Sequence, residues 1–227
     1  MLKRIGHELK HHVPFTLGGT VVAAAVMAGM VYGRVPHEVS EKLFAVAHPL
    51  HVLLSAMVTA GMYRLHGRGQ WWATLLIGYV GAVAIGTVSD CLIPYLGEWL
   101  LGAGDEHVHA RAHIGFIELW WLVNPLALAG VAIAYFRPRT EFPHAGHVLL
   151  STAASLFHMT MAMHEGIAVT TAAVLPVFLF LAVWLPCCTS DIVFPLLFVS
   201  PADRPPCGHC RGVREQTGED ADPEHES

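Results

Sequence analysis

Two pairs of histidines recur in this sequence with the same spacing and similar neighbours. His48 and His51 stand in His-Pro-Leu-His-Val-Leu-Leu-Ser, and His144 and His147 stand in His-Ala-Gly-His-Val-Leu-Leu-Ser. A separation of three residues places both rings of a pair on one face of a helix. Imidazole is the commonest metal ligand among side chains. The spacing therefore predicts that each pair binds a transition-metal ion.

Two aspartates lie in a second repeated motif. Asp90 and Asp191 each follow a serine and precede a proline by four residues, in the pattern Ser-Asp-x-x-x-Pro-x-Leu. Proline has no N–H group, so the aspartate carbonyl four residues earlier lacks its helical partner. A side-chain oxygen and a main-chain oxygen are then both available for a cation site or a proton relay. An ionised carboxylate at membrane depth costs at least about 2.5 kcal/mol, so it indicates a partner or a wet cavity.

Further candidate ligands are helix-end histidines and paired cysteines. They are His12, His113, the adjacent pair Cys187 and Cys188, and the pair Cys207 and Cys210. The last pair has the Cys-x-x-Cys spacing of half a zinc site. Thiolate and imidazole ligands suit soft and borderline metals. The whole set predicts zinc, manganese, copper or iron as the bound ion, without deciding among them.

Long apolar segments carry these residues. Of the 227 residues, 54% are hydrophobic and 14% are charged, whereas about 25% are charged in soluble proteins. A membrane-spanning helix needs roughly 20 mostly apolar residues. Six segments qualify, at residues 13–32, 45–63, 71–92, 113–136, 144–163 and 167–185. We therefore predict an all-α integral membrane protein with six transmembrane helices.

Charge and composition also constrain location and partners. Most of the 13 Lys and Arg residues fall on the side of both termini, which predicts cytoplasmic termini in a multi-pass protein of the inner (plasma) membrane. The net charge is −5 and no basic cluster is interleaved with aromatic residues, which tells against nucleic acid as a partner. Five cysteines are too few, and odd in number, for a secreted disulfide scaffold. The expected partners are a metal ion and the lipid bilayer, and a homodimer is left open.

The repeated motifs occur in the same order in the two halves of the chain. Residues 1–102 would form a first three-helix repeat, 103–200 a second, and 201–227 a disordered cytoplasmic tail. Three helices per repeat is an odd number, so the second repeat would be inverted in the membrane, as in many secondary transporters. This topology divides the ligands into an outer cluster of His48, His51, Asp90 and His113 and an inner cluster of His12, His144, His147, Asp191 and Cys187 or Cys188.

The second aspartate motif carries a family resemblance. Ser190-Asp191-x-x-x-Pro195-x-Leu197, preceded by Thr189, resembles the Thr-Ser-Asp-x-x-x-Pro signature of multi-pass heavy-metal exporters of the manganese type. His11-His12 ahead of the first apolar segment is similar to them as well. The resemblance covers short motifs near both ends of the chain. It implies export of a heavy-metal ion.

These observations predict a proton-coupled secondary transporter of a divalent or soft transition-metal ion, with export favoured, rather than an enzyme. The sequence has no P-loop, so an ion gradient would drive it. Asp90 and Asp191 would coordinate the ion or exchange protons, and the paired histidines would bind it at two gates. Two alternatives stay open. One is a membrane di-iron oxygenase with histidine boxes that begin at His7-x3-His11-His12, and the other is a bis-histidine haem protein.

Overall fold

The computed structural model describes residues 2–66, 70–101, 114–138, 141–161, 169–189 and 193–199. Within these ranges the regular structure is helical, which confirms the all-α prediction. The helices are α1 (Leu2–Tyr32), α2 (His37–His66), α3 (Trp71–Thr87), the π-helical turn η1 (Val88–Leu92), α4 (Ile93–Leu101), α5 (Gly115–Glu118), α6 (Trp120–Phe136), α7 (Glu141–Met161), α8 (Val169–Cys188) and α9 (Phe194–Leu197). The predicted tail, residues 201–227, lies outside the described residues.

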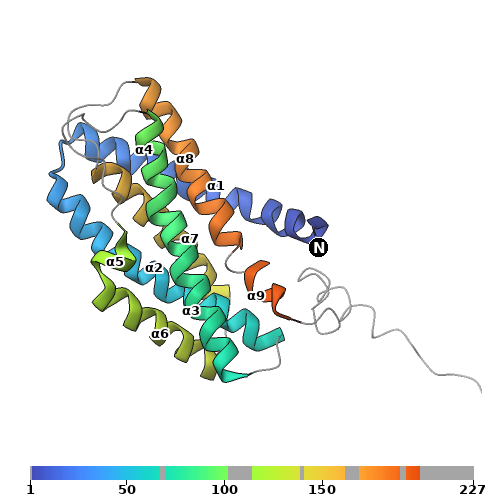
Figure 1. The fold of residues 1–227 in the computed structure, drawn as a ribbon. Helices are drawn as coiled ribbons and strands as arrows, with labels where there is room; N and C mark the ends of the chain where they lie inside the picture. Colours follow the sequence, from blue (N-terminus) through green and yellow to red (C-terminus); the bar gives the residue numbers. More distant parts are fainter. Residues whose placement is uncertain are drawn as a thin grey trace, which may run out of the picture.

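Helix α2 runs through the bundle and packs against α7, α6 and α3, while α1 packs against α7 and α8 (Figure 1). Helices α2 and α7 are antiparallel. His37 at the start of α2 bonds to the Met161 carbonyl at the end of α7 over 2.9 Å, and Gly146 near the start of α7 lies beside Leu54. Helices α2 and α6 are parallel, because Arg64 near the end of α2 lies 4.6 Å from the ring of Tyr135 near the end of α6. Helix α2 therefore packs against one antiparallel helix, α7, and one parallel helix, α6.

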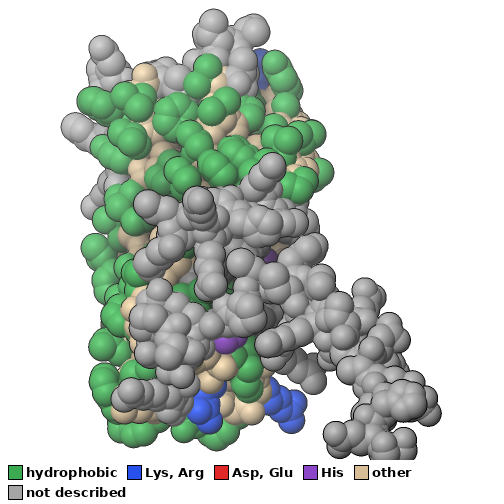
Figure 2. Space-filling model, turned by 90° about the vertical axis from the view of Figure 1, so that its right-hand side faces the viewer, with side chains coloured by type: hydrophobic (Ala, Val, Ile, Leu, Met, Phe, Trp, Pro, Cys, Tyr) green, Lys and Arg blue, Asp and Glu red, His purple; other side chains and the backbone are tan. Residues whose placement is uncertain are grey.

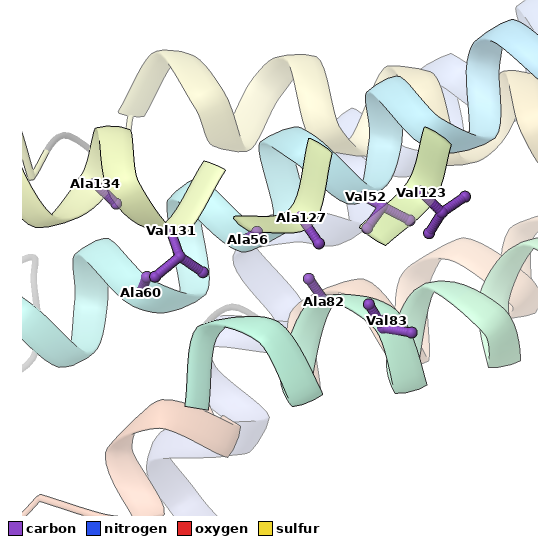
Figure 3. Packing of buried hydrophobic residues seen from close by; sticks show 9 residues of the cluster. All are labelled: Val52, Ala56, Ala60, Ala82, Val83, Val123, Ala127, Val131 and Ala134. Atoms are coloured by element: carbon purple, nitrogen blue, oxygen red, sulfur yellow. The ribbon is translucent and has the colours of Figure 1, made fainter. Parts of the chain in front are cut away.

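Small residues let α2, α3 and α6 approach closely (Figure 3). Their shared cluster consists of Val52, Ala56, Ala60, Ala82, Val83, Val123, Ala127, Val131 and Ala134. A methyl group added at Gly78 would lie 2.7 Å from Ala60 Cβ and 2.8 Å from Val131 Cγ2, so only glycine fits there without a shift. Small residues at helix contacts are the usual means of close packing in membrane proteins.

Many large apolar side chains are exposed on the described helices. Figure 2 shows one face, on which the described side chains are mostly hydrophobic and the Lys and Arg side chains lie toward the ends. Exposed tryptophans stand near helix ends, at Trp71, Trp72, Trp99, Trp120 and Trp121. Such rings are enriched where a membrane meets water.

Two of the described helices are long and apolar enough to cross a membrane, His37–His66 and the continuous segment Trp71–Gly97. Three further apolar stretches are shorter, at Thr16–Tyr32, Trp120–Phe136 and Val174–Cys187. The fourth expected span is shortened because the chain turns at Leu119, between α5 and α6. The count of six spans therefore stays a prediction.

Replacing Gly130 with alanine should destabilise the bundle. The added methyl group would overlap the Leu53 carbonyl oxygen, which belongs to the backbone of α2. We expect the free energy of unfolding to fall by about 1–3 kcal/mol, the usual cost of overpacking. Thermal unfolding of the purified protein in detergent measures this change.

Gly29→Ala is the matched control, since nothing lies within 4 Å of its added methyl group. Alanine stabilises a helix by about 0.5–1 kcal/mol relative to glycine. This variant should therefore unfold at the same temperature as the wild type or at a higher one. An equal loss in both variants would contradict the close approach of α6 to α2.

Candidate metal centre

The π-helical turn η1 carries Asp90 into the interior of the bundle. The Ile93 N–H group bonds to the Val88 carbonyl, five residues back instead of four. Pro94 contributes to this irregularity, because it has no N–H group to offer to the Asp90 carbonyl. Such turns widen a helix locally and are frequent at functional sites. Here the turn buries Asp90 completely, at 0% exposure.

The Asp90 carboxylate receives hydrogen bonds at both oxygens. Its Oδ2 lies 2.8 Å from His48 Nδ1 and 2.5 Å from His51 Nδ1, both on α2. Its Oδ1 accepts from Ser89 Oγ over 2.7 Å and from Ser151 Oγ of α7 over 2.9 Å. An ionised carboxylate can only accept, so both imidazoles carry their hydrogen on Nδ1. Asp90 thereby fixes the tautomer and the orientation of two rings at once.

The other nitrogens of these two rings have no hydrogen-bond partner among the described residues. Nε2 of His48 and Nε2 of His51 are buried, and neither makes a hydrogen bond to a described residue. A buried polar atom without a partner costs about 1–3 kcal/mol. In metalloproteins a ligating histidine usually donates its second N–H to a carboxylate, which leaves the first nitrogen for the ion. The Asp90 arrangement therefore matches the surroundings of metal-binding histidines.

The ring of His147 on α7 lies against the ring of His51. The two rings are stacked, with centroids 4.7 Å apart and 6° between their planes. His144 is edge-on to His147, with a centroid distance of 6.1 Å. Cys187 of α8, also buried, completes this side of the cluster. Helices α2, α7 and α8 thus contribute donors to one location.

Two overlapping groups of possible ligands result. His48, His51 and Asp90 form one, and His51, His147 and Cys187 form the other. In each group one donor atom per residue lies within 4.8 Å of the others. His51 belongs to both groups. We call these five residues the buried donor cluster.

The predicted division into separate outer and inner clusters is wrong for the described residues. His51 was expected on the outer side and His147 on the inner side, but their rings stack on each other. The reason is that α2 begins at His37, eight residues before the expected start, and α7 begins at Glu141. Both histidine pairs therefore lie inside their helices, where α2 and α7 pack against each other, and not at opposite ends of the bundle.

Several predicted ligands cannot be placed. His12 lies in α1 and Cys188 is the last residue of α8, but their side chains are outside the described part of the structure. His113, Asp191, Cys207 and Cys210 lie outside the described residues altogether. Their roles stay predictions.

Other residues support the cluster in ways that the spacing of metal ligands did not reveal. Ser155 Oγ donates to the Ser89 carbonyl over 3.1 Å and ties α7 to η1. Phe44 stacks on His48 with centroids 5.3 Å apart and meets His158 edge-on. One feature of the sequence does indicate these supporting residues: polar side chains recur every four positions on α7, at His147, Ser151 and Ser155.

Asp90→Asn should weaken metal binding by about 10- to 100-fold, the usual effect of losing the group that orients a ligating histidine. The amide keeps the shape of the carboxylate but removes its charge and one of its acceptor oxygens. Titration of the purified protein with Co²⁺ or Zn²⁺ against a competing chelator measures the affinity.

Glu38→Gln on the same helix as the histidines makes the same chemical change at an exposed position and should leave the affinity unchanged. If Asp90→Asn bound the metal ion as tightly as the wild type does, the Asp90 carboxylate would have no orienting role.

Comparisons with known proteins do not assign a family to this chain. No family model, no curated protein and no solved structure matches it. The resemblance to heavy-metal exporters therefore stays a prediction from short motifs. The chemistry of the buried donor cluster is the ground for a functional proposal.

Proposed function

We propose that this protein is a membrane transporter for a transition-metal ion, and that the ion passes through the buried donor cluster. One observation carries the proposal. Asp90 fixes the rings of His48 and His51, yet both Nε2 atoms are buried and have no hydrogen-bond partner in the part of the chain that the structure describes. An arrangement that only held the bundle together would have no reason to orient two imidazoles and leave their free nitrogens unsatisfied.

A membrane location with six transmembrane helices and both termini cytoplasmic is part of this proposal. The exposed apolar side chains support it, because a few hundred Å² is the usual limit for an apolar patch on a soluble protein. The two long apolar helices and the three shorter apolar stretches provide most of the expected segments. The fifth expected segment, 144–163, largely coincides with α7, which is not among these apolar helices.

The proposal also includes two inverted three-helix repeats, residues 1–102 and 103–200. The contact between His51 and His147 supports this, since the two residues are matched in the repeat and stack nearly parallel. Matched residues meet in this way when a two-fold axis passes between them, and α2 and α7 run in opposite directions as such an axis requires. In addition, Thr189 and Val193 are π-helical. They match Val88 and Leu92, the first and last residues of η1.

The expected position of the buried donor cluster, near the middle of the membrane, favours transport. Secondary transporters built from inverted repeats bind their ion near the middle of the membrane, between the repeats. The cluster has donors from α2 and η1 in the first half and from α7 and α8 in the second. Ligands must be deprotonated to bind a metal, so ion binding and proton release are coupled. A proton gradient could therefore drive the ion, and the resemblance to exporters favours the outward direction.

The di-iron oxygenase alternative has less support. Membrane di-iron sites need many histidines on one side, whereas the described centre offers three histidines in its two ligand groups. Its carboxylate is also engaged by four donors of the chain. A haem between His51 and His147 is disfavoured, because their ring centroids are 4.7 Å apart. No described feature favours either alternative over transport.

Flux in proteoliposomes tests the proposal. Vesicles that contain the purified protein and a metal-sensitive dye should take up Zn²⁺ or Co²⁺ faster when a pH gradient is imposed. The variant His48→Ala/His51→Ala should lose at least 10-fold in rate, because both oriented imidazoles are gone. His66→Ala is the matched control, since His66 lies on the same helix but bonds only to the Met62 carbonyl one turn earlier.

Gel filtration and circular dichroism of each variant would establish that it is folded. Flux no faster than in protein-free vesicles for every ion tested, or full flux in the double variant, would contradict the proposal.

A further inference from the structure

The buried thiol of Cys187 occupies a different environment from the other described cysteine. Cys187 is 1% exposed, is not in a disulfide, and packs with Val148 and Val183. Its sulfur lies within 4.8 Å of donor nitrogens of His51 and His147. Cys91 is equally buried but packs in an apolar cluster with Phe44 and its neighbours, and it belongs to neither ligand group. The two thiols therefore form a natural comparison.

Two imidazole nitrogens and one sulfur are a selective set of donors. Zinc is bound by cysteine at about 2.3 Å and by histidine at about 2.0–2.1 Å, usually as a tetrahedron. Donors around such an ion lie roughly 3.6 Å apart, so donor atoms within 4.8 Å of one another would draw closer on binding it. Manganese, magnesium and calcium prefer carboxylate, carbonyl and water oxygens, whereas sulfur favours zinc-type and copper-type ions. The chemistry of this group thus separates two classes of metal.

We propose that His51, His147 and Cys187 form a second ion position, adjacent to the Asp90 position, which selects thiophilic ions of the zinc type over manganese. The inference rests on the proposed function and narrows its substrate class. His51 is common to both positions, so an ion can move from Asp90 toward Cys187 without losing all of its protein ligands. The thiol proton leaves when the ion binds, as Cys–SH and M²⁺ give Cys–S–M⁺ and H⁺. No oxidant or reductant is needed.

Cobalt is a suitable probe, because a thiolate bound to Co²⁺ gives a near-ultraviolet charge-transfer band that nitrogen and oxygen ligands do not give. The experiment uses the full-length protein in detergent with Cys188, Cys207 and Cys210 replaced by serine, so that Cys91 and Cys187 are the remaining thiols. Co²⁺ should produce the band in this protein. Cys187→Ser should abolish it, and Cys91→Ser should leave it unchanged.

Affinity provides the second readout. Cys187→Ser should weaken Zn²⁺ binding at least 10-fold while changing Mn²⁺ binding less than 2-fold, because only the thiophilic ion gains from sulfur. If the serine variant does not fold, Cys187→Ala, which adds no polar group to the site, replaces it.

The outcomes separate this inference from the proposed function. Co²⁺ binding without the band, or with a band that survives Cys187→Ser, would overturn the Cys187 position. Transport through the Asp90 position would still stand if that binding were sensitive to Asp90→Asn. Failure of Co²⁺, Zn²⁺ and Mn²⁺ to bind at all would overturn both.

Discussion

The buried carboxylate of Asp90 is the group on which the arrangement of the bundle depends. Removing an ionised carboxylate from water costs several kcal/mol even after the protein relaxes. Hydrogen bonds offset this cost, and they come from three elements: the rings of His48 and His51 on α2, Ser89 in η1 itself, and Ser151 on α7. The relative positions of α2, η1 and α7 are thereby tied to one side chain. A shift of any of them would leave a charge or a donor unsatisfied.

Glycine and other small residues make room for this network. Gly115 lies so close to His48 that any side chain there would overlap the ring, and Gly86 lies beside His51. Farther along α2, Ala56 and Ala60 leave room for α3 and α6 to pack closely against it. Close packing of this kind resists displacement. The imidazoles are consequently held by their surroundings as well as by Asp90, which is the preorganisation that a metal site requires.

Part of this centre could be predicted from the sequence. The three-residue spacing of His48 and His51 specified two rings on one helical face, and the Ser-Asp-x-x-x-Pro motif marked Asp90 as a buried polar group. Both features are local, so a single helix determines them. The contact between His51 and His147 could not be predicted in the same way, because periodicity says which face a residue occupies but not the level at which two helices cross. Hydropathy alone also predicted that α2 begins eight residues later than it does. That late start placed His48 and His51 at the end of the helix, near a membrane surface, instead of inside the helix.

The two ligand groups also differ in how strongly they would hold an ion, and a transport path needs such a balance. Binding must be favourable enough for the ion to enter and weak enough for it to leave. Asp90 is already engaged by four donors, so it would act on an ion at the Nε2 atoms through the two rings that it orients, and not as a ligand itself. Among the described residues the Cys187 group offers three donors, one sulfur and two nitrogens, one fewer than a tetrahedral zinc-type ion takes. His51 belongs to both groups, so in the proposed transport an ion would pass from one group to the other without losing this ligand.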